Sequence, residues 1–370
     1  MAPKKPIEKA TFPHVVESAV ENGSGPEALY AALDLGTNSC RMLNAQPKGA
    51  QFHVIDSFAK SVQLGSGLEK TGKLSRDSMN RTIQALKVCK QKLDKYDVKY
   101  SRLIATEACR RAKNSKDFIL KVFQETGLKL NIIDTEEEAR LAVISCAPLV
   151  SSKSEQLLVV DIGGGSTELV WIDLSAVPSH ERPKSIMRLH SGFHSIESPF
   201  PAARVVDWIS VPLGVATLRD QFNDVEDDAA RFALMSWYFE EKLTDFAPYK
   251  DNKIDTSFQI IGTSGTVTTV ASSHLGLRRY DRTKVDGLRM TTDQIDKVIR
   301  SYLEMGPDGR KKDPRIGRDR QALIMSGSAI LQAMLRSWPT DKLTVADRGL
   351  REGLLYAQMS ANGVLEDVIL

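Results

Sequence analysis

The chain has 370 residues, of which 42% are hydrophobic and 26% are charged. That length exceeds the needs of one small core and predicts two domains, and the composition is ordinary for a soluble globular protein. Lysine and arginine together number 50, against 47 acidic residues. So small an excess gives no overall electrostatic field of the kind that marks nucleic-acid-binding proteins, and we expect no nucleic-acid partner.

The cysteines and the apolar runs indicate the cellular compartment of the protein. The cysteines are scattered without a paired spacing (Cys40, Cys89, Cys109 and Cys146), and the six histidines are equally dispersed. We therefore expect a reduced, cytoplasmic protein without a zinc site. No apolar run reaches membrane-spanning length and no signal peptide is recognisable, which predicts no membrane partner. Residues 1–27 are typical of a flexible N-terminal extension.

The first predicted hairpin is Leu29 to Leu43, LYAALDLGTNSCRML. An apolar strand reaches Asp34, a turn with Gly36 and Ser39 follows, and a second strand returns. Phe52 to Gly67 continues as strand and loop. The next segments are expected as a helix, a strand, a helix and a strand, at 74–96, 102–105, 115–126 and 128–134.

Two arginines, Arg110 and Arg111, follow the strand predicted at 102–105. Placed at the end of a strand, they would face a polyanion. The alternative is a solvated basic turn before the next helix, and position alone favours that alternative.

A helix is predicted from Asp134 to Leu149, DTEEEARLAVISCAPL. Thr135 with Glu138 three residues later has the spacing of a capping box, in which the glutamate bonds the backbone at the start of the helix. The other interpretation makes Glu138 a general base that points into a cleft. Spacing alone favours the capping box.

A second hairpin is predicted at Leu157 to Asp173, LLVVDIGGGSTELVWID. Because a strand rather than a helix follows the glycines, this is not a dinucleotide fingerprint. Consecutive glycines let backbone N–H groups converge into an anion-binding nest, although a plain glycine turn fits equally well. Aligning the hairpins pairs Asp34 with Asp161, Gly36 with Gly163, and Ser39 with Ser166. The repetition favours two related domains, each presenting a phosphate-binding turn to a shared cleft.

The second half of the chain holds a third glycine site. Val211 to Leu218 is expected as a strand and turn entering a helix, and the aromatic stripe of a helix at Asp228 to Phe246 is typical of a core. At Phe258 to Leu277 a strand runs through GTSGT into a helix. The start of that helix supplies unpaired N–H groups suited to an anion. A helix from Thr291, an amphipathic helix after Arg320 and a last strand–turn–helix at 343–359 complete the prediction.

These motifs, together with ATEACRRAKN and EEEAR in the same order, resemble the exopolyphosphatase/guanosine pentaphosphate phosphohydrolase family. That family belongs to the superfamily of acetate and sugar kinases, Hsp70 and actin, and the resemblance runs from about Ala31 to Tyr356. It implies an α/β fold with two ribonuclease-H-like (actin-like) domains around a central cleft. We expect domains at 28–138 and 139–342 and a C-terminal segment, 343–370, that packs back on the first domain.

The resemblance also implies the roles of individual residues. Glu138 and Glu168 are the implied catalytic carboxylates, with Glu138 as the base, and Asp34, Asp161 and Glu168 are the implied metal ligands. Arg110 matches the arginine of the family's ATxAxRxAxN motif. The implied phosphate-binding residues are Gly36, Thr37, Asn38, Ser39, Arg41, Arg110, Gly163, Gly164, Gly165, Ser166, Gly262, Thr263, Ser264, Gly265, Thr266 and Arg320.

The implied reaction is metal-dependent hydrolysis of a terminal phosphoanhydride, with Mg²⁺ or Mn²⁺ as the cofactor. Its substrates in the family are inorganic polyphosphate and guanosine pentaphosphate, which becomes the tetraphosphate, and we expect a homodimer. Two departures stand out: the chain ends at Leu370, without the further helical domain of longer members, and Ala346 replaces an expected serine.

Two other functions use the same loops. A superfamily kinase or ATPase would turn over ATP, but GTSGT lacks the adenosine signature of those relatives. A non-catalytic alarmone or nucleotide sensor would bind without releasing phosphate, and the carboxylates Glu138, Asp161 and Glu168 argue against it.

Overall fold

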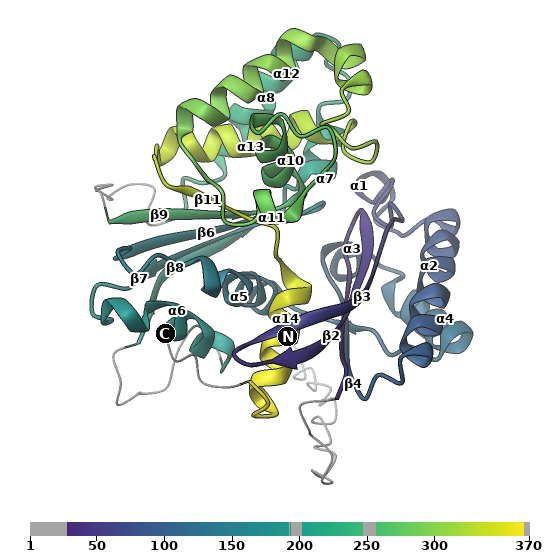
Figure 1. Cartoon of the computed structure of the whole chain (residues 1–370). Helices are drawn as coiled ribbons and strands as arrows, with labels where there is room; N and C mark the ends of the chain where they lie inside the picture. Colours follow the sequence, from purple (N-terminus) through teal and green to yellow (C-terminus); the bar gives the residue numbers. More distant parts are fainter. Residues whose placement is uncertain (1–27, 192, 194–201, 247–256, 366–370) are drawn as a thin grey trace, which may run out of the picture.

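A computed structural model describes residues 28–191, 193, 202–246 and 257–365. The expected N-terminal extension therefore lies outside the described residues. The chain forms two lobes, each built on a mixed sheet, with the first lobe in purple and blue and the second in teal, green and yellow (Figure 1). This arrangement confirms the predicted α/β fold class.

The first sheet has the strand order β3-β2-β1-β4-β5. Its central strand β1 pairs antiparallel with β2 and parallel with β4. Two long helices, α2 and α4, cover one face through apolar side chains such as Leu86 and Phe118. The expected strand at 128–134 is reduced to a two-residue β5. The elements are β1 (Tyr30–Leu35), β2 (Ser39–Lys48), β3 (Gln51–Ser61), α1 (Leu68–Thr71), α2 (Arg76–Lys95), β4 (Tyr100–Ala105), α3 (Glu107–Arg111), α4 (Ser115–Thr126) and β5 (Asn131–Ile132).

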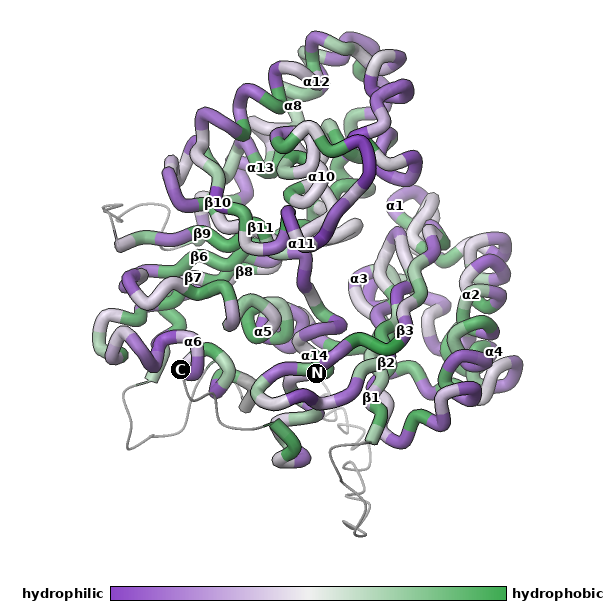
Figure 2. The backbone as a smooth tube through the Cα atoms, in the orientation of Figure 1, coloured by the Kyte–Doolittle hydropathy of each residue, from purple (hydrophilic) through white to green (hydrophobic). Residues whose placement is uncertain are grey.

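The second sheet has the order β10-β11-β9-β6-β7-β8 and carries the largest core. Figure 2 shows its strands β6, β7 and β9 in green, and the outer face of α12 largely in purple. The strands are β6 (Gln156–Ile162), β7 (Thr167–Asp173), β8 (Arg204–Val211), β9 (Phe258–Thr263), β10 (Arg289–Met290) and β11 (Leu343–Ala346). The helices are α6 (Arg182–Met187), α7 (Val215–Gln221), α8 (Asp228–Glu241), α10 (Gly265–His274), α11 (Arg282–Val285), α12 (Thr292–Lys312) and α13 (Ile324–Ser337).

Two helices, α5 (Thr135–Cys146) and α14 (Leu350–Ala361), lie side by side between the sheets. Ala139 and Val143 of α5 pack into a core of the second sheet, whereas Leu141 joins Leu354 of α14 in a core of the first sheet. The strand just before α14, β11, pairs with β9 of the second sheet. Within the expected segment 343–370, α14 therefore packs on the first sheet and β11 belongs to the second.

The start of α5 corrects one sequence interpretation. Its N-cap is Asp134, whose carboxylate accepts the backbone N–H of Glu137 at 2.8 Å. Aspartate is as good a cap as threonine, and it takes the position one residue earlier. Thr135 is already helical, so the predicted capping box between Thr135 and Glu138 is wrong. The side chain of Glu138 is free for another role.

The helix predicted at Asp228 to Phe246 is shorter than expected, since α8 ends at Glu241. Its aromatic stripe is only partly core: Phe232 and Phe239 are buried, but Trp237 is 56% exposed. Among the described residues, no helix combines the length and the apolar character needed to cross a membrane.

Candidate active site

The two hairpin turns have the same backbone geometry. In the first, the N–H of Gly36 donates to the carbonyl of Ser39 at 3.0 Å, and in the second, the N–H of Gly163 donates to the carbonyl of Ser166 at 2.9 Å. The sequence alignment of the two motifs is therefore confirmed as a structural repeat.

The repeat also pairs charged residues across each hairpin. Asp34 lies opposite Arg41 on β1 and β2, and Asp161 lies opposite Glu168 on β6 and β7. Arg41 and Glu168 therefore occupy equivalent positions with opposite charge. One hairpin presents a carboxylate and a guanidinium, and the other presents two carboxylates.

The turns of the two hairpins touch each other. A Cβ on Gly165 would lie 2.5 Å from Oγ1 of Thr37 and 2.9 Å from Cγ of Glu107, so only glycine allows this approach. Within the described part of the chain, the N–H groups of Gly164 and Gly165 have no acceptor. These unpaired donors form the concave surface on which an anion is stabilised.

The third glycine loop joins β9 to α10. Oγ of Ser264 caps the helix by accepting the N–H of Val267 at 3.0 Å, and the N–H of Gly265 has no acceptor among the described residues. The guanidinium of Arg320 lies against Gly265, in space that a Cβ would occupy. Burial and the nearby charge of Arg41 lower the pKa of Arg320 to about 10. An anion at the start of this helix would reduce the repulsion between Arg320 and Arg41 and would accept hydrogen bonds from the unpaired N–H groups.

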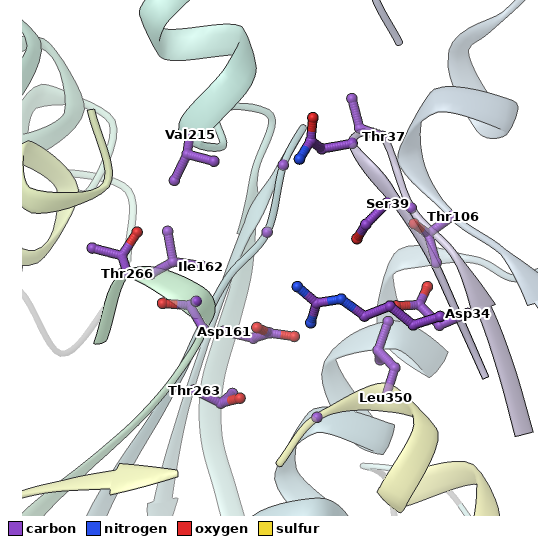
Figure 3. A pocket seen from close by; sticks show the side chains of 18 of the residues that line it. Asp34, Thr37, Ser39, Thr106, Asp161, Ile162, Val215, Thr263, Thr266 and Leu350 are labelled. Carbon is purple, nitrogen blue, oxygen red and sulfur yellow. The ribbon is translucent and has the colours of Figure 1, made fainter. Parts of the chain in front are cut away.

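All three loops line one cleft between the lobes, with a cavity volume of about 150 Å³. In Figure 3, Asp34, Thr37 and Ser39 form one wall, whereas Asp161, Thr263 and Thr266 form the other. Of the predicted site residues, the cleft is lined by Asp34, Gly36, Thr37, Asn38, Ser39, Arg41, Glu138, Asp161, Gly163, Gly164, Gly165, Ser166, Thr263, Ser264, Gly265, Thr266 and Arg320. Arg110, Glu168 and Gly262 do not line it.

Arg110 holds Glu138 in place instead of facing the cleft. Its Nη1 donates to Oε2 of Glu138 at 2.6 Å and to the carbonyl of Ile133 at 3.0 Å, and its Nη2 donates to Glu107 at 2.8 Å. Glu138 is only 6% exposed. Burial and the charge of Glu168 raise the pKa of Glu138 well above its usual value, while Arg110 opposes that rise. A carboxyl group with a raised pKa is suited to accept a proton near neutral pH.

The other acidic residues also carry raised pKa values. Burial and the charges of Glu138 and Asp34 raise the pKa of Asp161 to about 8. Burial and Asp161 raise the pKa of Glu168 to about 7, although Glu168 accepts a hydrogen bond from Ser210 at 2.8 Å. Oδ1 of Asp34 is buried without a hydrogen-bond partner.

Such a set of repelling, partly unsatisfied carboxylates fits a divalent cation. In the described ranges, however, no three His, Cys, Asp or Glu side chains are arranged to hold a metal by themselves. Asp34 and Asp161 line the cleft and Glu168 does not. The arrangement therefore suits an ion that takes one or two protein carboxylates and completes its coordination with substrate phosphates and water.

Two cleft arginines stand apart from the carboxylates. In the described part of the chain, neither Arg41 nor Arg320 lies within 4.0 Å of a carboxylate, unlike the ion-paired Arg110 and Arg348. Burial and Arg351 lower the pKa of Arg41. Partly buried guanidinium groups without an ion pair in the described residues are suited to bind phosphate oxygens in pairs.

Sequence reasoning missed two parts of the cleft. Thr106 and Glu107, at the start of α3, line it beside the predicted arginine motif. The loop from Asp347 to Arg351 lines it as well, and Thr263 of the third loop donates to the carbonyl of Arg348. The signal in the sequence was ADRGLREG, where a glycine and two arginines follow the last strand directly.

Comparison with known proteins identifies the family. A solved Ppx/GppA family member from Aquifex aeolicus shares 29% sequence identity with a TM-score of 0.70, covering 90% of this chain and 98% of that chain. The PPX-GPPA enzyme of Aquifex aeolicus shares 30%, with a TM-score of 0.68 and 89% and 99% coverage. An exopolyphosphatase from Cytophaga hutchinsonii has the same fold, with a TM-score of 0.75 at 21% identity over 91% and 100% of the chains. The Ppx/GppA phosphatase family model matches residues 44–362, and the chain therefore belongs to that family.

Proposed function

We propose that the chain is an exopolyphosphatase, which releases terminal orthophosphate from inorganic polyphosphate, with guanosine pentaphosphate as a second candidate substrate. The observation that carries this proposal is the convergence on one cleft of three glycine loops, a buried carboxylate and two arginines that have no ion pair within the described ranges. Membership of a phosphatase family supports the same class of reaction. Phosphoryl transfer depends mostly on positioning and charge stabilisation, which such loops and arginines supply.

The proposed base is Glu138. Its carboxylate takes a proton from a water molecule, whose oxygen bonds to the terminal phosphorus while the bond from that phosphorus to the bridging oxygen breaks. The products are orthophosphate and a chain one phosphate shorter. Arg110 fixes the position of Glu138 through its hydrogen bond of 2.6 Å. Arg41, Arg320 and the N–H groups of the loops would bind the phosphate oxygens and stabilise their charge.

Asp34 and Asp161 would hold Mg²⁺ or Mn²⁺, since both line the cleft and Asp34 has an unsatisfied buried oxygen. A bound ion would neutralise phosphate charge and lower the repulsion among the carboxylates. Glu168 acts from outside the cleft in this proposal, by raising the pKa of Glu138 through its charge. The hydrogen bond from Ser210 keeps Glu168 in that place.

Phosphate release in the presence of Mg²⁺ tests the proposal, with long polyphosphate, tripolyphosphate, guanosine pentaphosphate and ATP in parallel. We expect release from both polyphosphates and little from ATP. Turnover of ATP alone would indicate an ATPase or kinase instead. Tight binding of the pentaphosphate without any release would indicate a sensor.

We also propose a homodimer in the cytoplasm, as the sequence predicts. Sedimentation equilibrium of the purified chain would test the dimer. A monomer at all concentrations would contradict it, and the hydrolysis assay would be unaffected by that result.

A further inference from the structure

A second cavity, of about 360 Å³, lies outside the cleft, and its charged lining residues are predominantly cationic. It is formed by α7, α8, the end of α12, α13 and the turn before α13. Its charged lining residues are Arg219, Arg231, Arg310, Lys311 and Arg318, against a single carboxylate, Asp228. None of these residues belongs to the candidate active site.

The floor of the cavity is a rigid arginine pair. Both terminal nitrogens of Arg310 donate to Asp228 at 2.8 Å, and one of them also donates to the carbonyl of Tyr302 at 2.7 Å. Arg231 donates to the same carboxylate at 3.0 Å. Since one carboxylate serves two guanidinium groups, the floor keeps a net positive charge in a fixed place.

The other cations are available to a ligand. Among the residues that the structure describes, Lys311 pairs only with the exposed Asp308, at 3.2 Å, and surface pairs of that kind contribute little. Arg318 has no carboxylate within ion-pairing distance among the described residues. Arg219 bonds its neighbour Asp220, which does not line the cavity. A polyanion would gain several contacts here and displace few.

Two segments of the chain contribute residues both to this cavity and to the cleft. In the turn before α13, Arg320 and Leu323 line the cleft, whereas Arg318 lines the cavity. In α7, Val215 lines the cleft and Arg219, one turn later, lines the cavity. Figure 1 shows the chain between α12 and α13 descending beside α10 and α7, on the side of the second lobe that faces α1.

We propose that this second cavity binds the uncleaved stretch of a long inorganic polyphosphate whose terminal phosphate lies in the cleft. The inference rests on the proposed function and deepens it. A phosphate chain carries about one charge per unit and has no bases or side chains, so a fixed cationic cavity is sufficient to recognise it. Short polyphosphates fill the cleft alone and gain nothing from the cavity.

The test compares the double variant Lys311→Gln, Arg318→Gln with a matched control, Lys116→Gln, Lys153→Gln, which removes two exposed lysines elsewhere. We expect the KM for long-chain polyphosphate to rise about 3- to 10-fold in the cavity variant, with kcat unchanged. The KM for tripolyphosphate should change by less than about 2-fold. The control should match the parent protein for both substrates.

Direct binding gives a readout that needs no turnover. In EDTA, the cavity variant should bind labelled long-chain polyphosphate more weakly than the control, with a weaker dependence on salt. Equal effects at both chain lengths, or no effect, would overturn the inference. Competition by single-stranded RNA at equal affinity would show a general polyanion surface and would also overturn it. If the parent protein binds long-chain polyphosphate through the cavity but releases no phosphate, the proposed function fails and the binding site stands.

Discussion

Arg110 and Glu138 form a buried ion pair of 2.6 Å that joins α3 of the first lobe to α5. Because the second nitrogen of Arg110 donates to Glu107, one guanidinium fixes both carboxylates at the base of the cleft. The arginine lowers the pKa of Glu138, and burial raises it. These opposing effects set the pH at which Glu138 can accept a proton.

Glu138→Gln should abolish phosphate release while the protein stays folded. The amide keeps the size of the side chain and an oxygen that can accept from Arg110, but it removes the charge that pairs with that guanidinium, so we expect a lower melting temperature in a protein that still folds. A loss of at least about 10²-fold in kcat is expected for removal of a general base. Glu136→Gln, on the same helix, is the matched control and should retain full activity. Full activity in Glu138→Gln would exclude this residue as the base.

Arg110→Gln should move the acid limb of the pH–rate profile toward higher pH. Without the guanidinium, burial raises the pKa of Glu138 further, and a larger fraction is protonated at neutral pH. The kcat should fall more than the KM rises, since Arg110 does not line the cleft. Arg111→Gln breaks an exposed pair with Glu69 and serves as the control. A raised KM with an unmoved acid limb would assign Arg110 to phosphate binding instead.

Metal-free protein should lose stability as the pH rises. The pKa of Asp161 is about 8 in the fold against an ordinary 3.8, so between those values the native state holds a proton that the unfolded chain has released. The free energy of unfolding therefore falls from about pH 4 to about pH 8. In EDTA we expect Tm to drop by about 3 °C or more over that range, and Mg²⁺ should oppose the drop.

The variant that tests this prediction is Asp161→Asn, in which the part of the pH dependence of stability that comes from Asp161 should disappear. Asp224→Asn, an exposed position, should leave it unchanged. A pH dependence that is identical in all three proteins would mean that Asp161 ionises normally in the fold.

The loops of the site could be predicted from the sequence because each rests on a local pattern. An apolar strand, an aspartate, glycines and a serine specify a hairpin turn within a few residues, and the repetition at Asp34 and Asp161 showed that two such turns belong together. The strand–GTSGT–helix unit is equally local, and the structure has it as predicted.

Long-range partners were beyond the reach of local patterns. The sequence around Arg110 predicted either a phosphate ligand or a solvated turn. Its hydrogen bond to Glu138 depends on how α3 packs against α5. Glu168 occupies a strand position equivalent to that of Arg41, but its hydrogen bond from Ser210 depends on the pairing of β7 with β8. The site itself combines predicted turns with contacts that only the packing of helices between the sheets creates.

The cap of α5 can be tested by a pair of substitutions. Asp134→Ala should cost about 1 kcal/mol of stability, because it removes the acceptor of the Glu137 N–H. Thr135→Ala should be nearly neutral, since Thr135 is a helical residue and makes no capping bond. Chemical denaturation of the two variants gives the comparison. A larger cost for Thr135→Ala would restore the capping box that the sequence favoured.

The contact between α5 and α14 links packing to the site, because α5 carries Glu138 and the start of α14 carries Arg351. Gly353 faces the backbone of Leu141 so closely that a Cβ would lie 2.8 Å from its carbonyl carbon. Gly353→Ala should therefore cost about 1–3 kcal/mol and lower activity by shifting α14 in the cleft. Ser360→Ala, exposed on the same helix, should do neither.

The obstacle to Gly353→Ala is backbone, so trimming a side chain should not remove it. Adding Leu141→Ala to Gly353→Ala should destabilise the protein further, because Leu141 is buried against Leu354 and its loss leaves a cavity. Rescue of stability by Leu141→Ala would show that the helices meet through side chains. In that case the close approach of α5 and α14 would not be what aligns Glu138 with Arg351.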